Sequence, residues 1–193
     1  MMKFDVVVIG GGLAGMTAAT ALQQGGLKCA VVAEGLSLSG ASREAYTAAG
    51  GTLLAGDRVT GGMIENGRLV SIRTEKLGDV TLEARAFILA TGKFFSRGIV
   101  ADMQKVYEPG AAVGDVQYDA DRSTWFSPSF AAPQRFLEFG VIAEDGCAVR
   151  DGVKIENLFP AGEVLAGLSS AASDATAEIK KSALAAAEAA RRI

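Results

Sequence analysis

Asp5-Val-Val-Val-Ile-Gly10-Gly11-Gly12-Leu-Ala-Gly15 is the stretch that decides the fold of this chain, together with Glu34, which follows it after eighteen intervening residues. Val6 to Ile9 is a short, wholly apolar run, typical of a strand that is buried on both faces of a parallel sheet. A glycine turn follows, and a helix is expected from about Leu13 to Gln24. A strand, a glycine turn and a helix in this order predict a site for an adenine dinucleotide.

Each glycine of the turn has a separate physical role. Gly10 permits the tight turn, Gly12 lets the backbone approach a pyrophosphate closely, and Gly15 lets the helix pack near the strand. The helix begins at Leu13 and Ala14, so its first amides and its dipole face the phosphates. These five residues are therefore candidates for binding the cofactor.

Glu34 is the candidate for the adenosine end of the site. Gly25-Gly26 is expected to end the helix, and Cys29 to Ala33 forms the second strand. Glu34 follows that strand directly, where a carboxylate accepts hydrogen bonds from the ribose hydroxyls.

The start of the chain also allows two rival interpretations. Met1-Met2-Lys3 followed by the uncharged stretch from Val6 to Leu22 superficially resembles a signal peptide. Asp5 and the glycines within the run argue against a signal peptide and against a membrane span. The expected location is therefore cytoplasmic.

Composition restricts the classes of function. The 193 residues predict one domain, and a hydrophobic content of 49% is ample for its core. A net charge of −3 without a Lys/Arg cluster argues against a nucleic-acid partner. Cys29 and Cys147 are far apart and histidine is absent, so neither a redox disulfide nor a metal site is expected. No catalytic residue is identified.

Residues 1–34 are expected to form a βαβ unit. A short helix from Ser42 to Ala49, capped by Ser42, and a short strand from Thr52 to Leu54 are expected to follow. An antiparallel β-meander is then expected over residues 57–84. Asn66-Gly67 is a strong hairpin signal within it. The three strands of the meander are expected at Arg58 to Ile64, Arg68 to Glu75 and Val80 to Ala84. Phe87 to Ala90 is then predicted to be a separate, buried parallel strand.

The remaining chain divides into two parts. Residues 94–150 form an aromatic-rich insert for which irregular structure and short strands are expected. Its aromatics form either a cover for a ligand or partner or, as we favour, a core of their own. Residues 151–193 supply a closing strand and an alanine-rich helix from about Ala175 to Arg192, with Asp174 as its cap.

Two further motifs bear on the identity of the dinucleotide. Ala90-Thr91-Gly92 ends a buried strand, and Thr91 and Gly92 are candidates for backbone contacts to the cofactor. Ile155 to Glu163 is a short apolar strand that ends in Ala-Gly-acid, which makes Gly162 and Glu163 candidates for the ribityl end of a flavin. A plain NAD-binding domain would instead continue through more βα repeats.

The order of these motifs resembles the FAD-binding half of the glutathione-reductase-type flavoproteins. The expected fold is therefore α/β, with a central parallel sheet, a three-stranded antiparallel β-meander and flanking helices. Several stretches also resemble the B subunit of the anaerobic glycerol-3-phosphate dehydrogenases. They are Lys3 to Gly15, Phe87 to Val100, Phe130 to Gln134, Phe139 to Val141, Ile155 to Phe159 and Gly162.

This resemblance implies a flavin-dependent dehydrogenase subunit that binds FAD, or FMN, and oxidises sn-glycerol 3-phosphate to dihydroxyacetone phosphate. It also implies two partners, the A and C subunits, through which electrons pass to a membrane quinone. These partners would hold the chain at the surface of the inner membrane. The chain departs from the family in lacking a long middle segment after Glu34 and in its entrance to the last helix, Ala171 to Glu178.

Two alternatives to a dehydrogenase subunit stay open. The departures favour a non-catalytic FAD-fold module that binds a partner subunit. A domain for NAD(P)H is a third interpretation. Lys93 and Arg97, which follow the Ala-Thr-Gly turn, are expected to be solvated surface charges rather than ligands for a phosphate.

Overall fold

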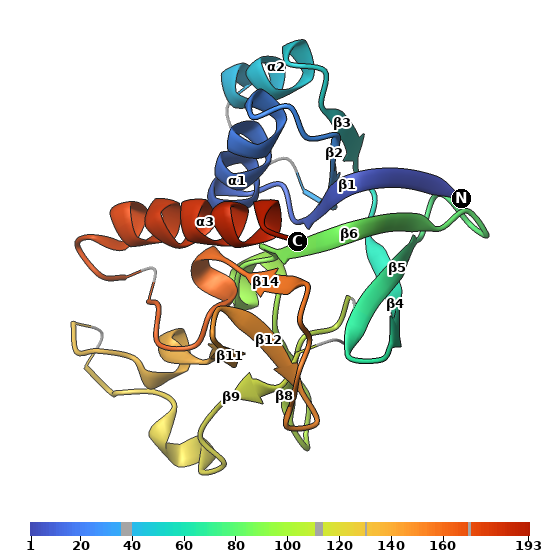
Figure 1. Ribbon diagram of the computed structural model, residues 1–193. Helices are drawn as coiled ribbons and strands as arrows, with labels where there is room; N and C mark the ends of the chain where they lie inside the picture. Colours follow the sequence, from blue (N-terminus) through green and yellow to red (C-terminus); the bar gives the residue numbers. More distant parts are fainter. Residues whose placement is uncertain (36–39, 111–113, 130, 170) are drawn as a thin grey trace.

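A mixed β-sheet forms the centre of the computed structural model, which describes residues 1–35, 40–110, 114–129, 131–169 and 171–193 (Figure 1). Within these residues the sheet has seven strands in the order β3-β2-β1-β6-β5-β4, and β14 also pairs with β6. The strands are β1 (Met2–Ile9), β2 (Cys29–Ala33), β3 (Thr52–Ala55), β4 (Val59–Glu65), β5 (Arg68–Thr74), β6 (Leu82–Leu89) and β14 (Leu158–Pro160).

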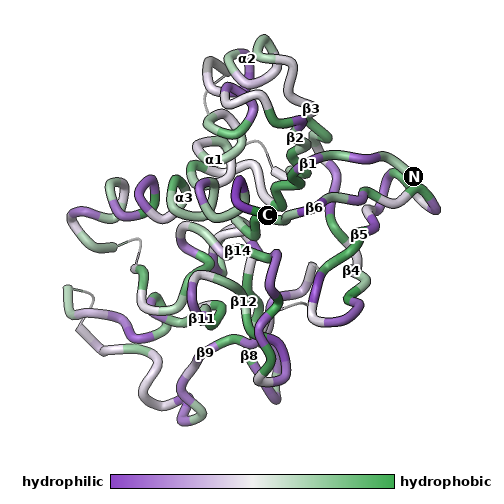
Figure 2. The backbone as a smooth tube through the Cα atoms, in the orientation of Figure 1, coloured by the Kyte–Doolittle hydropathy of each residue, from purple (hydrophilic) through white to green (hydrophobic). Residues whose placement is uncertain are grey.

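The parallel part of the sheet is buried on both faces. β1 lies between β2 and β6, and Val6 is in register with Cys29 on one side and Ala86 on the other. Val6 and Val8 pack into the cluster that includes the helices, while Val7 packs into the cluster on the opposite face. The apolar run from Val6 to Ile9 in β1 is therefore explained by two covered faces, and Figure 2 shows the inner part of the central strands mostly in the hydrophobic colour.

Two helices cover one face of the sheet. They are α1 (Leu13–Gln24) and α3 (Ala175–Arg191), which pack against each other, α1 contacting β1 and α3 contacting β6 (Figure 1). α1 has the predicted bounds. Asp174 lies at the predicted N-cap position of α3, but its side chain makes no capping hydrogen bond among the described residues.

The third helix, α2 (Gly40–Ala48), begins two residues before the predicted Ser42, so Ser42 is not its cap. Tyr46 on this helix is fully buried, and its hydroxyl donates hydrogen bonds to the carbonyl oxygens of Cys29 at 2.8 Å and Thr52 at 3.3 Å. The Tyr46 side chain therefore ties α2 to both β2 and β3.

The predicted division of residues 80–90 into two strands is wrong. A single strand, Leu82–Leu89, replaces the two expected strands from Val80 to Ala84 and from Phe87 to Ala90. Its start pairs antiparallel with β5, and its other edge pairs parallel with β1 along its whole length. Arg85 breaks the apolar pattern of the sequence, but its exposed side chain pairs with Asp5 at 3.0 Å and the strand continues beneath it.

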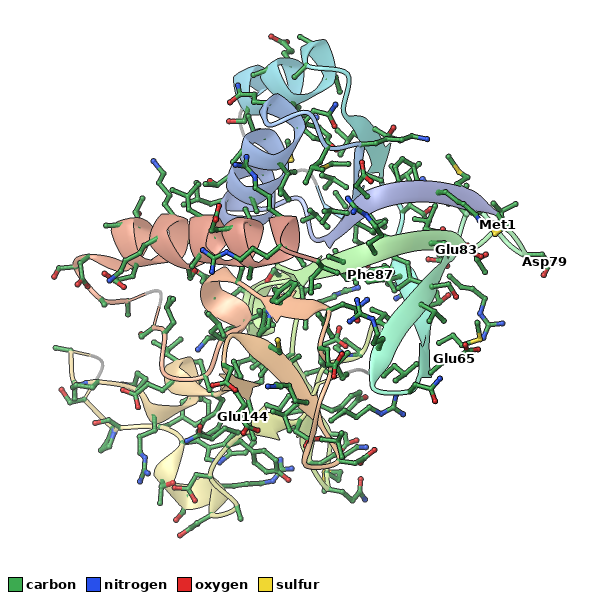
Figure 3. The ribbon with its side chains drawn as sticks, in the orientation of Figure 1. Met1, Glu65, Asp79, Glu83, Phe87 and Glu144 are labelled. Carbon is green, nitrogen blue, oxygen red and sulfur yellow. The ribbon has the colours of Figure 1, made fainter. Side chains whose placement is uncertain are left out.

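The meander consists of β4, β5 and the first part of β6. Asn66 and Gly67 form the predicted hairpin turn, with φ angles of 51° and 74°. Figure 3 shows Phe87 of β6 in the interior, whereas Glu65 lies beside the β4–β5 hairpin turn and Asp79 lies in the β5–β6 turn at the other end of the meander. β6 thus connects the exposed meander to the buried sheet.

The described part of residues 94–150 is irregular, as predicted. Trp125 and Phe139 are buried there with Ile99 and Val106, and the two rings meet edge to face at 5.2 Å. These rings therefore form a small core of their own, although Phe95 and Phe126 are exposed. The short elements of residues 94–164 are η1 (Phe94–Ser96), β7 (Val100–Ala101), β8 (Val106–Tyr107), β9 (Val116–Gln117), η2 (Arg122–Thr124), η3 (Arg135–Glu138), β10 (Gly140–Val141), β11 (Ala143–Glu144), β12 (Cys147–Arg150), β13 (Val153–Lys154) and η4 (Gly162–Val164).

Phe130, and residues 36–39 where relatives are expected to be longer, lie outside the described residues. None of the helices in the described part of the chain combines the length and the apolarity that crossing a bilayer requires.

Candidate nucleotide site

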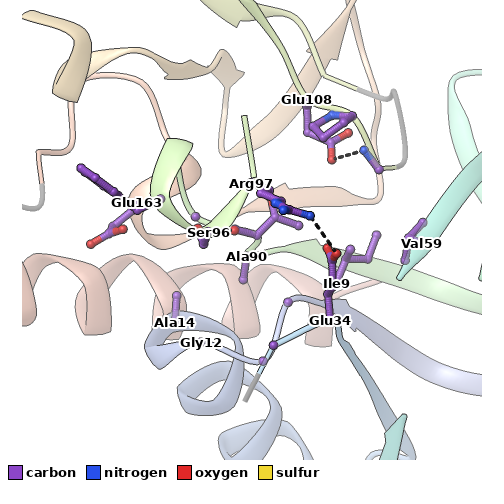
Figure 4. Close-up of a pocket in the computed structure, with 18 of the residues that line it drawn as sticks. Ile9, Gly12, Ala14, Glu34, Val59, Ala90, Ser96, Arg97, Glu108 and Glu163 are labelled. Carbon is purple, nitrogen blue, oxygen red and sulfur yellow. Dashed lines mark hydrogen bonds and ion pairs between the residues drawn. The ribbon is translucent and has the colours of Figure 1, made fainter. Parts of the chain in front are cut away.

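A cavity of about 1370 Å³ opens at the carboxyl ends of β1, β2 and β6 (Figure 4). Ligands of open α/β sheets bind at this edge. Pockets for drug-sized ligands have volumes of roughly 300–1,000 Å³, so this cavity has room for a larger molecule such as a dinucleotide.

The glycine turn forms the floor of the cavity. Gly10 has a φ of +113°, and a Cβ atom there would collide with the carbonyl oxygen of Ala90 at the end of β6. Gly15 lies behind the turn, where a Cβ atom would collide with the carbonyl oxygen of Gly10. These two glycines therefore let the turn pack tightly against its neighbours.

Gly12 differs from both. It is the N-cap of α1 with an extended backbone (φ −78°, ψ −169°), and a Cβ atom built there would meet no described atom within 4 Å. Leu13 and Ala14 begin the helix and also line the cavity. Because the first amides of a helix have no intrahelical acceptor, this open space is a cradle for an anion.

Glu34 and Arg97 face each other across the cavity. Glu34 follows β2, Arg97 follows η1, and both line the cavity. The Arg97 guanidinium lies 3.8 Å from the Glu34 carboxylate, and both side chains are substantially exposed (Figure 4). The carboxylate predicted to bind the ribose therefore has a cationic partner from the opposite wall.

The Ala-Thr-Gly turn forms the wall above the glycines. The Ser96 hydroxyl holds this turn by donating to the carbonyl oxygens of Thr91 at 2.8 Å and Lys93 at 3.2 Å. Thr91 Oγ1 is buried and has no hydrogen-bond partner within the described residues. Thr91 and Gly92 both line the cavity.

Glu163 lies on the opposite side of the cavity from Glu34 (Figure 4). It belongs to η4, directly after β14 and Ala161. Gly162 has a different role, because a Cβ atom there would lie 2.5 Å from the Cβ of Ala14, and its amide donates to Ser182 Oγ at 2.9 Å. Gly162 thus fixes the loop that presents Glu163.

Eight of the ten candidate residues lie around this one cavity. They are Gly10, Gly12, Leu13, Ala14, Glu34, Thr91, Gly92 and Glu163. Gly15 and Gly162 are packing positions that lie just behind its wall.

The prediction that Lys93 is a solvated surface charge is wrong. It is buried, with 3% of its surface exposed, and its Nζ donates to the carbonyl oxygen of Leu137 at 2.6 Å. Burial lowers the pKa of Lys93 to about 8, although the carboxylates of Glu163 and Glu138 oppose that change. Lys93 is therefore not a solvated charge, whereas Arg97 is exposed as predicted.

Asp57 and the segment from Tyr107 to Gly110 also line the cavity, and sequence reasoning missed both. Burial raises the pKa of Asp57, but hydrogen bonds from Thr74 Oγ1 and from the Lys76 and Arg58 amides outweigh burial and keep the pKa below its ordinary value. Asp57 lies just beyond the carboxyl end of β3, a position that could have identified it. The segment from Tyr107 to Gly110 comes from the irregular region and carries no such signal.

The cysteines take no part in the cavity. Cys29 and Cys147 are both free and buried, and burial raises the pKa of Cys29 to about 12. In the part of the chain that the structure describes, no group of His, Cys, Asp and Glu side chains is arranged to hold a metal ion. The chemistry of the site therefore rests on backbone amides, carboxylates and Arg97.

Comparison with known proteins agrees with this geometry. The FAD binding domain family matches residues 5–59 and 43–175. The B subunit of anaerobic glycerol-3-phosphate dehydrogenase from Vibrio cholerae is 36% identical over 136 residues, which cover 69% of this chain and 31% of that protein. The corresponding protein from Pasteurella multocida is 33% identical over 123 residues, covering 61% of this chain and 29% of that protein. This chain thus spans about a third of the length of these relatives.

A solved structure shows the same fold over the whole chain. The thioredoxin reductase of T. acidophilum aligns with 100% of this chain and 99% of its own, with a TM-score of 0.58 and 13% identity. At that identity the likeness concerns the fold alone.

Proposed function

Because the chain belongs to the FAD binding domain family, we propose that it holds FAD in this cavity and works as a flavin-dependent oxidoreductase. The observation that carries the proposal is the open cradle at Gly12, where the backbone leaves space for a pyrophosphate beside the first amides of α1.

The residues present fit the adenosine diphosphate half of FAD. The cradle at Gly12 would take the pyrophosphate, and Glu34 would accept hydrogen bonds from the ribose. FMN lacks the adenosine and one phosphate, so it would leave the Glu34 end of the cavity unused. This difference favours FAD over FMN.

The residues present also fit the flavin half. Glu163 lines the cavity on the side away from Glu34, and its carboxylate would accept hydrogen bonds from the ribityl hydroxyls. Asp174 and Glu178, at the entrance to α3, are exposed and are not among the residues that line the cavity. FAD, when bound, would supply the hydride-accepting group, and the chain would supply position, electrostatics and shelter from water.

The finer proposal concerns substrate and partners. Similarity to the B subunit of anaerobic glycerol-3-phosphate dehydrogenase supports glycerol 3-phosphate as the substrate. The word "subunit" in the name of that relative supports assembly with partners, which we propose to be the A and C subunits, with electrons passing to a membrane quinone. A cytoplasmic location, peripheral to the inner membrane through these partners, follows from this proposal.

A second candidate is an FAD-fold module without dehydrogenase activity of its own. It is favoured by the absence of histidine from the sequence, because histidine is the commonest general acid or base near neutral pH. Such a module would bind FAD and a partner subunit without oxidising a substrate.

Ligand titration combined with an activity assay distinguishes the dehydrogenase from the FAD-fold module. FAD, FMN and NADPH are each added to the purified chain while protein and flavin fluorescence are followed, and an artificial acceptor then reports oxidation of glycerol 3-phosphate. The dehydrogenase predicts FAD binding stronger than binding of FMN or NADPH, together with substrate-dependent reduction of the acceptor. FAD binding without reduction supports the module, and tighter binding of NADPH than of FAD would overturn both.

A further inference from the structure

Arg97 is a cavity residue that the functions proposed above leave without a role. It reaches from the loop after η1 across the space above the glycine turn to the Glu34 carboxylate (Figure 4). Its only ion pair among the described residues is therefore with the very group that is proposed to bind ribose.

The backbone holds Arg97 in place by an uncommon conformation. Its φ is +59°, in the left-handed region that residues other than glycine rarely adopt. Its amide donates to the carbonyl oxygen of Phe94 at 3.2 Å, and the Gly98 amide donates to that of Lys93 at 2.9 Å. Such strained positions cluster at ligand-binding sites.

The charges that line the cavity favour a role toward an anion. Within the described residues, two cations line it, and Arg58 already pairs with Glu75 at 3.4 Å. Carboxylates outnumber these cations, since Glu34, Asp57, Glu108 and Glu163 also line the cavity. A diphosphate in this acidic surrounding needs a cation, and Arg97 lies on the wall opposite the Gly12 cradle.

We propose that Arg97 is a specificity-determining residue that exchanges partners: it holds Glu34 when no nucleotide is bound and binds the diphosphate when one is. This inference rests on the proposed FAD site. The exchange frees the Glu34 carboxylate for the ribose and makes affinity depend on the diphosphate. The chain would therefore select dinucleotides, and nucleoside diphosphates generally, over nucleosides.

The magnitudes favour the exchange. Both side chains of the Arg97–Glu34 pair are substantially exposed and such pairs are weak, so releasing Glu34 costs at most about fivefold in affinity. A hydrogen bond to a charged group is stronger, so contact between the guanidinium and a phosphate is expected to raise affinity about tenfold or more.

The test compares ADP-ribose, which has the diphosphate of FAD, with adenosine, which has none. Dissociation constants for both are measured by calorimetry for the wild-type chain, Arg97→Ala, Arg97→Lys and Arg58→Ala. Arg58→Ala is the matched control, because it removes the other cation from the cavity wall. Circular dichroism and thermal unfolding confirm that each variant is folded.

The expected result is a loss of about tenfold in ADP-ribose affinity for Arg97→Ala and a smaller loss for Arg97→Lys. Adenosine affinity should not fall in Arg97→Ala and should rise by up to several-fold, because Glu34 no longer has to be released from Arg97. Equal losses for both ligands, or an equal effect of Arg58→Ala on ADP-ribose, would overturn the inference. A wild-type chain that binds neither FAD nor ADP-ribose would overturn the proposed FAD site and the inference together. Normal FAD binding with an unaffected Arg97→Ala variant would overturn the inference alone.

Discussion

Substitution of Gly12 is expected to weaken binding of the proposed FAD ligand while changing the stability of the fold very little. A Cβ atom at Gly12 would meet no described atom within 4 Å, so Gly12→Ala introduces no collision in the protein. Alanine is a poorer N-cap than glycine by roughly 0.5–1 kcal/mol, but it also reduces the entropy of the unfolded chain by a similar amount. The net change in unfolding free energy is therefore about 1 kcal/mol or less, which corresponds to under about 4 °C in Tm.

The same Cβ atom would occupy the space that the pyrophosphate is proposed to fill. Displacing the phosphates from the α1 amides would remove charge-assisted hydrogen bonds worth about 1.5–3 kcal/mol each. Losing two such bonds predicts a decrease of about 100-fold or more in FAD affinity. Gly12→Val should have a larger effect, because its side chain fills more of the cradle.

The assay pairs thermal unfolding without ligand with titration of FAD for each variant. Gly10→Ala is the matched contrast, because Gly10 has a φ of +113° and packs against the Ala90 carbonyl. It should destabilise the chain by about 3 kcal/mol or more. The reasoning would be refuted if Gly12→Val bound FAD as tightly as the wild-type chain, or if it unfolded as easily as Gly10→Ala.

Three further predictions concern the fold. Lys93→Met removes a pH dependence: burial lowers the pKa of Lys93 from 10.5 to about 8, so between these values the unfolded chain holds more protons and stability rises with pH. From pH 8 to pH 10.5 the unfolding free energy of the wild-type chain should therefore rise by on the order of 3 kcal/mol relative to that of the Met variant. Denaturant titrations at several pH values measure this difference, and the same pH dependence of unfolding free energy in both proteins would contradict the prediction. Asn157→Ala leaves the Leu69 amide and carbonyl, each bonded to Asn157 at 2.8 Å, without partners, so a loss of about 3 kcal/mol is expected and an unchanged Tm would argue against it. Tyr46→Phe removes the hydroxyl contact to Cys29 and should cost roughly 1–2 kcal/mol by denaturant titration, whereas a stabilised variant would show that this contact does not hold the sheet.

The parallel core could be predicted from the sequence because its signals are local. Val6 to Ile9 is apolar throughout, and the glycine turn and α1 follow it without interruption. The continuity of β6 could not be predicted, because Arg85 interrupts the apolar pattern and its partner Asp5 lies 80 residues away on β1. The error thus came from a contact between residues far apart in the sequence.

The candidate site divides in the same way. The glycine turn, Glu34, Thr91 and Glu163 follow strand ends, and parallel strands bring such positions to one edge of the sheet. The burial of Lys93 depends on the carbonyl of Leu137, which lies 44 residues away in an irregular segment. No periodic pattern predicts a contact of that kind.

A crystal structure of the chain grown with saturating FAD tests the central claim most directly. The account predicts density for the adenosine diphosphate above Gly10 to Gly12, with the ribose within hydrogen-bond distance of Glu34 and the ribityl chain toward Glu163. An empty cavity at saturating FAD, or FAD bound elsewhere on the chain, would contradict it.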